Sequence, residues 1–368
     1  MNYLIPFIIL ITVVVFIHEY GHYYFAKKYG VGVSDFSIGF GKEIFGWNDK
    51  SGTRWKICWI PLGGYVKFFG DRNVFSQSEQ TEVLKKYNNE DQKKLFILKP
   101  LYQRSLIVAA GPIANYVLAL LIFIFIYMFV GKDMTPAIIN EVQKDSPAYI
   151  AGVKKNDRII SIDNKKVSSI LEVSTFISTS TSEIIEFSIL RNDQELILNI
   201  KPDLVESKDY LGNKIKKRMI GIKLAPYNNE FNNVKLGPTK AIFYSVKEVW
   251  FVSTTSLKYL ASMITGSGDS SQLGGPIRIA KITGQIAEYG VIPFLSIMAY
   301  ISISLGLINL FPIPMLDGGH LMFYLFEKIL GRPLQQRTQE GFFRIGIFLL
   351  ISLMLFATFN DLKDLGLF

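Results

Sequence analysis

Four long apolar runs dominate the chain, and they cover residues 1–25, 106–130, 291–316 and 345–360. A helix needs about 20 apolar residues to cross a hydrocarbon layer roughly 30 Å thick. The runs therefore predict an α-helical membrane protein with about four transmembrane helices. The first run lacks the basic start and the small-residue cleavage site of a signal peptide, so we expect it to be retained as a span.

Residues 241–264 form a further apolar segment, but Lys247, Glu248 and Lys258 interrupt it. Charged groups are costly inside a bilayer and are tolerated at its surface. The segment therefore predicts an amphipathic helix that lies in the membrane interface, rather than a fifth span.

Residues 134–225 have a different pattern, in which short stretches of β-forming residues alternate with turn residues. This pattern predicts a compact β-rich module. Its sequence SPAYIAGVKKNDRIISIDNKKV is similar to a PDZ domain, with Pro147 and Ala148 opening a short helix that Gly152 ends. The resemblance implies either binding of a peptide along a sheet edge or a purely steric role. The predicted domains are an N-terminal half of the membrane core at 1–133, the PDZ-like domain at 134–225, a linker with the interfacial helix at 226–290, and a C-terminal half of the membrane core at 291–368.

The composition agrees with a membrane protein, because only 19% of the residues are charged, against about 25% in soluble domains. A single cysteine, Cys58, excludes an internal disulfide. The net charge of +9 is typical of lysines beside a membrane when the chain is 49% hydrophobic. We therefore expect membrane lipid, and no nucleic acid, among the partners.

The charges in the loops predict the orientation. Residues 26–104 hold 14 Lys and Arg against 8 Asp and Glu, and Lys328, Arg332 and Arg337 follow the third run. Because short cytoplasmic loops carry an excess of Lys and Arg, both segments should be cytoplasmic. The two termini and residues 131–290 should then lie on the outer side.

Candidate chemistry begins at His18-Glu19-Tyr20-Gly21-His22, an H-E-x-x-H sequence. On a helix, positions i and i+4 share one face, so both imidazoles can bind one Zn²⁺ while the glutamate accepts a proton from water. The alternative is a pair of histidines that caps the polar end of a span. Ionisable groups inside a span are costly and usually functional, which favours the metal site.

Catalytic zinc normally has three protein ligands. Position 28 is a lysine, which excludes the third histidine of the metzincin pattern. The candidates from the residues alone are Asp317 and His320, because Pro312 and Pro314 should break the third helix just before them.

The depth of this third ligand supports the interfacial interpretation of residues 241–264. If that segment crossed the membrane, the third span would run in the opposite direction. The candidate third ligands after Pro314 would then emerge on the far side of the membrane from His18 and His22, and no common metal site could form.

These motifs resemble those of the site-2 protease family of intramembrane zinc metalloproteases, in particular the bacterial regulator-of-sigma-E protease group. H-E-x-x-H matches at residues 18–22, and N-x-x-P-x-x-x-L-D-G matches at residues 309–318. GPIAN at residues 111–115 and IPLGGYVKF at residues 60–68 match two further family motifs. The resemblance covers nearly the whole chain in order, with one PDZ-like domain where the best-known members carry two.

The resemblance implies a Zn²⁺ held by His18, His22 and Asp317, with Glu19 as general base and acid. It implies hydrolysis of peptide bonds in or near the transmembrane helix of single-span membrane proteins, such as anti-sigma factors or signal-peptide remnants. It also implies a multi-pass protein of a bacterial inner membrane, with the PDZ-like domain and both termini periplasmic. The alternative functions are a catalytically silent membrane scaffold that presents a PDZ module and a transporter, for which no inverted repeat is visible.

The resemblance further implies that a hairpin at residues 54–69 dips into the membrane. Its free edge, with Gly63, Gly64 and Tyr65, could bind a substrate held extended, because a helix shields its own carbonyl groups from attack. Structural packing is the other interpretation of this hairpin. Asn309 is expected to stabilise negative charge on the carbonyl oxygen during hydrolysis, with an interhelical hydrogen bond as the alternative.

Overall fold

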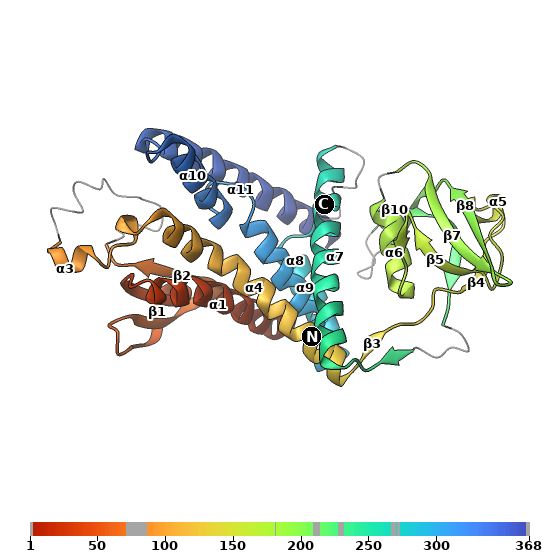
Figure 1. The fold of residues 1–368 in the computed structure, drawn as a ribbon, viewed down its shortest axis with the longest axis horizontal. Coiled ribbons are helices and arrows are strands. Elements are labelled where there is room, and N and C mark those ends of the chain that lie inside the picture. Colours follow the sequence, from red (N-terminus) through yellow and green to blue (C-terminus); the bar gives the residue numbers. More distant parts are fainter. Residues whose placement is uncertain are drawn as a thin grey trace. The chain divides into compact units, whose positions relative to one another are not determined.

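The computed structural model describes residues 3–70, 87–180, 182–208, 214–226, 232–265, 270 and 273–365 (Figure 1). Residues 227–231, 266–269 and 271–272 of the predicted linker therefore lie outside the described residues. The helices are α1 (Leu4–Lys28), α3 (Asn89–Gln92), α4 (Leu101–Phe129), α5 (Pro147–Ile150), α6 (Ile170–Thr179), α7 (Pro238–Ile264), α8 (Pro276–Glu288), α9 (Val291–Asn309), α10 (Asp317–Leu330) and α11 (Gln336–Asp364). The strands are β1 (Val33–Asn48), β2 (Arg54–Phe68), β3 (Lys132–Asp133), β4 (Ile139–Val142), β5 (Arg158–Ile162), β6 (Lys165–Lys166), β7 (Ile185–Arg191), β8 (Gln194–Ile200), β9 (Asp203–Lys208), β10 (Lys214–Met219), β11 (Ile222–Leu224) and β12 (Asn233–Val234).

Among the described residues, four helices are long and apolar enough to cross a membrane, namely α1, α4, α9 and the stretch of α11 from Arg337 to Asp364. This confirms the four predicted apolar helices, and α7 is not one of them. The predicted span bounds differ from the helices, since α1 ends at Lys28 instead of residue 25 and α4 begins at Leu101 instead of residue 106. The third helix ends at Asn309, inside the predicted run to residue 316, because Pro312 and Pro314 follow and break the helix as predicted. The fourth begins at Gln336 instead of residue 345, because the polar residues before the apolar run are also helical.

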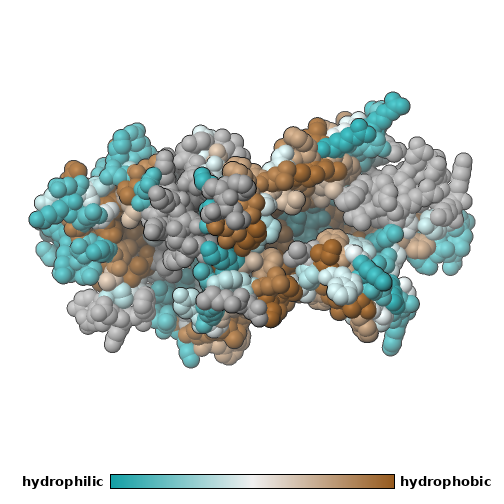
Figure 2. Space-filling view, turned by 180° about the vertical axis from the view of Figure 1, so that it is seen from behind, coloured by the Kyte–Doolittle hydropathy of each residue, from teal (hydrophilic) through white to brown (hydrophobic). Residues whose placement is uncertain are grey.

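The chain forms two compact units, one of Met1–Ile122 with Gly274–Phe368 and one of Phe123–Leu273. In the first unit α1 packs against α8 and α9. The sequence pattern did not single out α8, whose start is held by a distant carboxylate. Asp361 of α11 is buried and accepts hydrogen bonds from the backbone N–H groups of Gly275 and Ile277 at 2.8 and 2.9 Å. Hydrophobic residues form several patches on the surface shown in Figure 2.

Both β1 and β2 are folded over, so that each contributes two segments to one small sheet. Residues 35–38 of β1 pair with residues 64–67 of β2 on one side and with residues 54–57 on the other. Residues 54–58 also pair with residues 43–48. Among the described residues, the segment that ends β2, residues 64–68, therefore pairs on one side only and is an edge of the sheet.

The turn between β1 and β2 is fastened to α1 through Asp49. Its Oδ1 accepts hydrogen bonds from the N–H groups of Ser51 and Thr53 at 2.8 and 2.9 Å. Its Oδ2 accepts one from the hydroxyl of Tyr23, on α1, at 2.7 Å. Burial raises the pKa of the Asp49 carboxyl, but the hydrogen bonds outweigh burial and hold that pKa below its usual range. The sheet is thus tied to the helix that carries His18 and His22.

The second unit has its own apolar core. Its largest sheet has the strand order β6-β5-β7-β8, while β4 pairs with β11 and β9 pairs with β10. Side chains from the sheets fill the core, among them Ile139, Ile159, Ile162, Ile185, Phe187 and Ile200. The predicted short helix at Pro147 is present as α5, and Gly152 follows it with φ +82°. Helix α6 was not predicted.

Helix α7 belongs to this second unit, which is therefore wider than the predicted module at 134–225. The Glu248 carboxylate of α7 accepts hydrogen bonds from the Tyr127 hydroxyl and from Lys132, both at 3.2 Å. These contacts join α7 to the end of α4.

We expect Asp49→Ala to loosen the sheet from α1, because the mutation leaves the Tyr23 hydroxyl and two backbone N–H groups without their acceptor. The expected cost is about 1–3 kcal/mol of unfolding free energy, measured by thermal unfolding and by hydrogen exchange of residues 54–68. Because the folded-state pKa is depressed, the anchor persists above the unfolded value of about 3.9 and is lost as the pH falls through the folded-state pKa.

The control for this experiment is Glu43→Ala, which removes an ion pair with Arg54 inside the sheet. Equal hydrogen exchange in the two variants would contradict the anchoring role of Asp49.

Candidate metal centre

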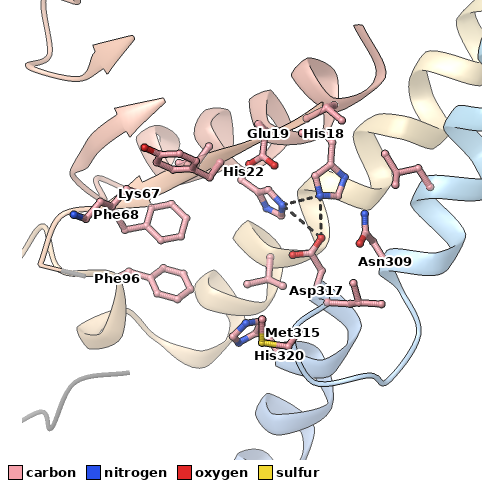
Figure 3. Close-up of a pocket in the computed structure, with 18 of the residues that line it drawn as sticks. His18, Glu19, His22, Lys67, Phe68, Phe96, Asn309, Met315, Asp317 and His320 are labelled. Atoms are coloured by element: carbon pink, nitrogen blue, oxygen red, sulfur yellow. Dashed lines mark hydrogen bonds and ion pairs between the residues drawn. The ribbon is translucent and has the colours of Figure 1, made fainter. Parts of the chain in front are cut away.

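The histidines of the H-E-x-x-H sequence lie one turn apart on α1, and their rings point to the same side (Figure 3). The Nε2 atoms of His18 and His22 are 3.3 Å apart. The helix continues beyond them to Lys28, so both side chains stand on a regular helical segment. The spacing of four residues therefore places the two imidazoles as the sequence predicts.

Asp317 completes a triangle with these histidines. Its Oδ2 lies 3.2 Å from His18 Nε2 and 3.5 Å from His22 Nε2. Asp317 is the first residue of α10 and follows the loop that contains Pro312 and Pro314. The chain break after α9 therefore turns this carboxylate back toward α1.

The three side chains fit a zinc ion. In a tetrahedral site with bonds of about 2.1 Å, the ligand atoms lie about 3.4 Å from one another. The three distances of 3.3, 3.2 and 3.5 Å agree with that value. The buried Asp317 Oδ2 has no hydrogen-bond partner among the described residues, as expected for an atom that binds a cation.

The structure does not bring His320 into this triangle. Its ring packs instead on the ring of Phe343, with centroids 5.7 Å apart, and lies near Phe323. Figure 3 shows it apart from the dashed lines that join His18, His22 and Asp317. Of the two candidates for a third ligand, Asp317 is the one in place.

His22 is positioned by α4. Its Nδ1 donates a hydrogen bond to the carbonyl oxygen of Ile107 at 2.9 Å, which leaves Nε2 free for a metal. A Cβ atom at Gly111 would lie 2.3 Å from His22 Nε2, so only glycine leaves room for the ring. Pro112 lies inside the same helix and interrupts its backbone hydrogen bonding. The GPIAN sequence thus acts on the metal centre through Gly111.

A cavity of about 360 Å³ opens beside the triangle. Glu19 and Asn309 line it, and so do Gly63, Gly64 and Tyr65 of the hairpin. The structure therefore brings all the predicted site residues to one cavity. Apolar residues that were not predicted also line it, among them Phe68, Phe96 and Val108.

The edge of β2 faces this cavity through its backbone. The N–H of Phe69 bonds to Gly32, next to β1, and the backbone of Val66 hydrogen-bonds to the Glu19 carboxylate. Because alternate residues direct their backbone groups to opposite edges of a strand, Gly64, Val66 and Phe68 present theirs to the free edge. Tyr65, which was also predicted to bind the substrate at this edge, directs its backbone toward β1. The alternation of backbone direction along a strand could have predicted this difference between Tyr65 and its neighbours only if the order of the strands in the sheet had been known.

Comparisons with known proteins agree with this site. A model of Peptidase family M50 matches residues 6–353. "Putative zinc metalloprotease Atu1380" of Agrobacterium fabrum is 40% identical over 364 residues, which cover 99% of this chain and 96% of that protein. "Putative zinc metalloprotease R01501" of Rhizobium meliloti is 40% identical and covers 99% and 97%. "Metalloprotease MmpA" of Caulobacter vibrioides is 34% identical and covers 99% and 96%.

Among solved structures, the PDZ domain of an SdrC-like protein from Listeria monocytogenes is 21% identical. The match covers 25% of this chain and 90% of that one, with a TM-score of 0.20. A score this low does not establish a shared fold, so the PDZ assignment stays a prediction.

We expect Asp317→Ala to weaken zinc binding at least about 100-fold, because one of three ligands is lost. His320→Ala should bind zinc within about threefold of the unmodified protein, since its ring lies outside the triangle. The measurement is the zinc dissociation constant of the detergent-solubilised chain, from competition with a chromophoric chelator. Unchanged zinc affinity in Asp317→Ala would refute the assignment of the third ligand.

Proposed function

The chain belongs to Peptidase family M50 and is a zinc metalloprotease of the site-2 type, and we propose that it cuts single-span membrane proteins within or near their transmembrane helix. The observation that supports this proposal is the meeting of His18, His22 and Asp317 between helices apolar enough to span a membrane. A hydrolytic centre built on such helices acts on peptide bonds at membrane depth.

The residues around the cavity divide the chemistry among them. His18, His22 and Asp317 would hold the zinc, which when bound supplies Lewis acidity toward water and toward the scissile carbonyl. Glu19 takes a proton from the attacking water as the new C–O bond forms. It then gives that proton to the leaving nitrogen as the C–N bond breaks. Water and peptide are consumed, and a carboxyl and an amine group result.

Asn309 is proposed to stabilise the negative charge that develops on the carbonyl oxygen. It is the last residue of α9, lines the cavity, and lies near Asp317 in Figure 3. An amide donor in a water-poor site contributes about 3 kcal/mol to the transition state, or a factor of 10² to 10³ in rate. Such a donor acts on the reaction without binding the metal.

The free edge of β2 is proposed to hold the substrate extended. A transmembrane helix satisfies its own backbone hydrogen bonds, so its carbonyl groups are shielded from attack until the helix opens. Gly64, Val66 and Phe68 direct their backbone groups to this edge, where those groups could replace the hydrogen bonds of the opened helix. Because Val66 also contacts Glu19, a strand added at this edge would pass beside the general base.

The hairpin is proposed to reach into the membrane from the cytoplasmic side. It exposes Trp59 and Ile60, of which Trp59 is 68% exposed, and the neighbouring β1 exposes Phe45 and Trp47. Aromatic side chains of this kind are favoured at membrane interfaces. The expected location is a bacterial inner membrane, with the β-rich unit on the periplasmic side.

Helix α7 is proposed to lie along the outer membrane surface. Ala241 and Ser245 are buried, whereas Phe243, Val246 and Trp250 are exposed. The exposed residues recur every three to four positions and form an apolar stripe suited to the lipid interface. This orientation keeps Asp317 at the depth of the two histidines.

The PDZ-like domain is proposed to meet the outer portion of the substrate. It either binds a peptide along a sheet edge or excludes substrates whose outer domain is too large. In either role, the domain acts on the substrate before the peptide bond is cut.

Glu19→Gln should abolish cleavage of a model single-span substrate while the bound zinc is retained, because the mutation removes the proton acceptor and keeps the three ligands. The assay is substrate cleavage in proteoliposomes together with metal analysis of the same preparation. A catalytically silent scaffold would behave identically with and without this mutation, so equal behaviour of the two proteins would defeat the proposed function.

A test of the substrate-binding edge compares Phe68→Pro with Phe68→Ala. Both mutations remove the ring that stacks on Phe96, but only proline removes an N–H from the free edge. On a stable-helix substrate we expect at least tenfold slower cleavage by the proline variant. On a substrate whose helix is weakened by glycine, the two variants should differ much less.

Asn309→Ala is a control for this comparison. Asn309→Ala should slow both substrates equally, because it acts after the helix has opened. Substitutions at Gly64 are unsuitable, since a Cβ there would lie 3.3 Å from the Glu19 side chain and 2.6 Å from the Ser37 carbonyl oxygen. If the ratio of the cleavage rates of Phe68→Pro and Phe68→Ala were the same on both substrates, the free edge would not be what opens the substrate helix.

Cysteine labelling tests the orientation. Lys165→Cys and Asn192→Cys should react with an impermeant thiol reagent added from the outer side, and Asn88→Cys should not; all three positions are exposed. The natural Cys58 is 3% exposed and should give little background. The opposite labelling pattern would overturn the proposed topology.

A further inference from the structure

In each of the two ligating histidines, the ring proton must lie on Nδ1, the nitrogen that does not bind the metal. A neutral imidazole that binds a metal through Nε2 carries its hydrogen on Nδ1. His18 and His22 both direct Nε2 toward Asp317. His22 Nδ1 has an acceptor, the Ile107 carbonyl oxygen at 2.9 Å. His18 Nδ1 needs an acceptor as well if the two ligands are to be equally well held.

The neighbour of His18 Nδ1 is the side chain of Asn115, on α4. Its Nδ2 lies 3.3 Å from His18 Nδ1, and the residue is fully buried. Its Oδ1 has no hydrogen-bond partner among the described residues. An amide nitrogen only donates, so in this orientation the His18 proton would lie on Nε2 and would block the metal.

The two ends of a side-chain amide have the same shape, and hydrogen bonding decides which end faces a neighbour. A half-turn of the Asn115 amide brings Oδ1 to the position 3.3 Å from His18 Nδ1 that Nδ2 occupies. The oxygen then accepts the Nδ1–H hydrogen bond. Metal binding by His18 therefore requires the amide with its oxygen toward the imidazole.

We propose that Asn115 is a positioning residue of the metal centre, which accepts a hydrogen bond from His18 Nδ1 and so keeps Nε2 available to zinc. This inference rests on the zinc site of the proposed function. It assigns a role to the last residue of the GPIAN sequence.

The packing of α4 on α1 supports this role. Gly111 faces His22, since its Cβ would lie 2.3 Å from that ring, and Asn115 faces His18. Residues 111 and 115 are one helical turn apart, as the two histidines are. Gly111 and Asn115 thus lie on one face of α4, where they face His22 and His18, respectively.

Asn115 is itself held from the other side. Its backbone carbonyl oxygen accepts a hydrogen bond from the Ser302 hydroxyl of α9 at 2.9 Å, and both residues are buried. Helix α9 leads to Asn309 and, after the proline loop, to Asp317. Asn115 therefore lies between the two segments of the chain that supply the ligands.

The test compares Asn115→Leu, which has a similar size and no acceptor, with Asn115→Asp, which keeps an acceptor oxygen. We expect Asn115→Leu to raise the zinc dissociation constant about 10- to 100-fold. Asn115→Asp and the control Ser302→Ala, which keeps the amide, should stay within about threefold. The measurement is chelator competition on the detergent-solubilised full chain, with thermal unfolding of each metal-free variant as a check of folding.

Nitrogen NMR supplies a second readout, because the chain has only 3 histidines to label with ¹⁵N. In the zinc-loaded protein, His18 should show a protonated, slowly exchanging Nδ1. A His18 that binds zinc through Nδ1, or whose Nδ1 proton exchanges freely with solvent, would overturn the inference even if Asn115→Leu did not fold.

The outcomes separate this inference from the proposed function. Zinc affinity in Asn115→Leu equal to that of the unmodified protein, or equal losses in Asn115→Leu and Asn115→Asp, would refute the role of Asn115 alone. An unmodified chain that binds no zinc would refute both the role and the metal site.

Discussion

The structure depends on holding two imidazoles and a carboxylate within 3.2–3.5 Å of one another inside an apolar helical unit. Polar groups in such surroundings are costly unless they satisfy one another or bind an ion. The helices must also approach closely. A Cβ at Gly21 would lie 2.3 Å from the Ala110 carbonyl oxygen, and one at Gly318 would lie 2.3 Å from that of Leu310. Glycines at the helix contacts therefore make the centre sterically possible.

The proposed single-span substrate adds a second constraint. A helix inside a membrane has no reason to unfold unless another partner replaces its backbone hydrogen bonds. A sheet edge beside His18, His22 and Asp317 is a physical solution, because within the described part of the chain residues 64–68 pair on one side only. Gly63, with φ +107°, adopts the left-handed conformation that turns the chain into this edge. Asp49 in turn ties the sheet to α1, so the edge and the histidines are positioned by the same helix.

Local rules predicted the regular elements of the fold. Hydrophobic runs of about 20 residues identified four helices, because the length of a helix that crosses lipid is set by the bilayer. The ends of these runs are not the ends of the helices, since a run of apolar residues continues through Pro312 and Pro314, where those prolines predict and the structure shows a break. They also missed α8, whose start is capped by Asp361 from a segment more than 80 residues away. No local pattern contains such a contact.

The sequence by itself determined the chemistry available to this protein, because the spacing of His18, Glu19 and His22 places three reactive groups on adjoining positions of any helix that contains them. It left the third ligand open between Asp317 and His320, and the tertiary structure decided for Asp317, since only the loop after α9 sets how the chain returns to α1. The tertiary structure alone also decided that Gly64, Val66 and Phe68 form a free edge, and that Asn115 lies against His18. The free edge depends on the order of the strands in the sheet, and the contact of Asn115 with His18 depends on the packing of helices 97 residues apart in sequence. At such separations, the spacing of residues in the sequence does not determine their positions in space.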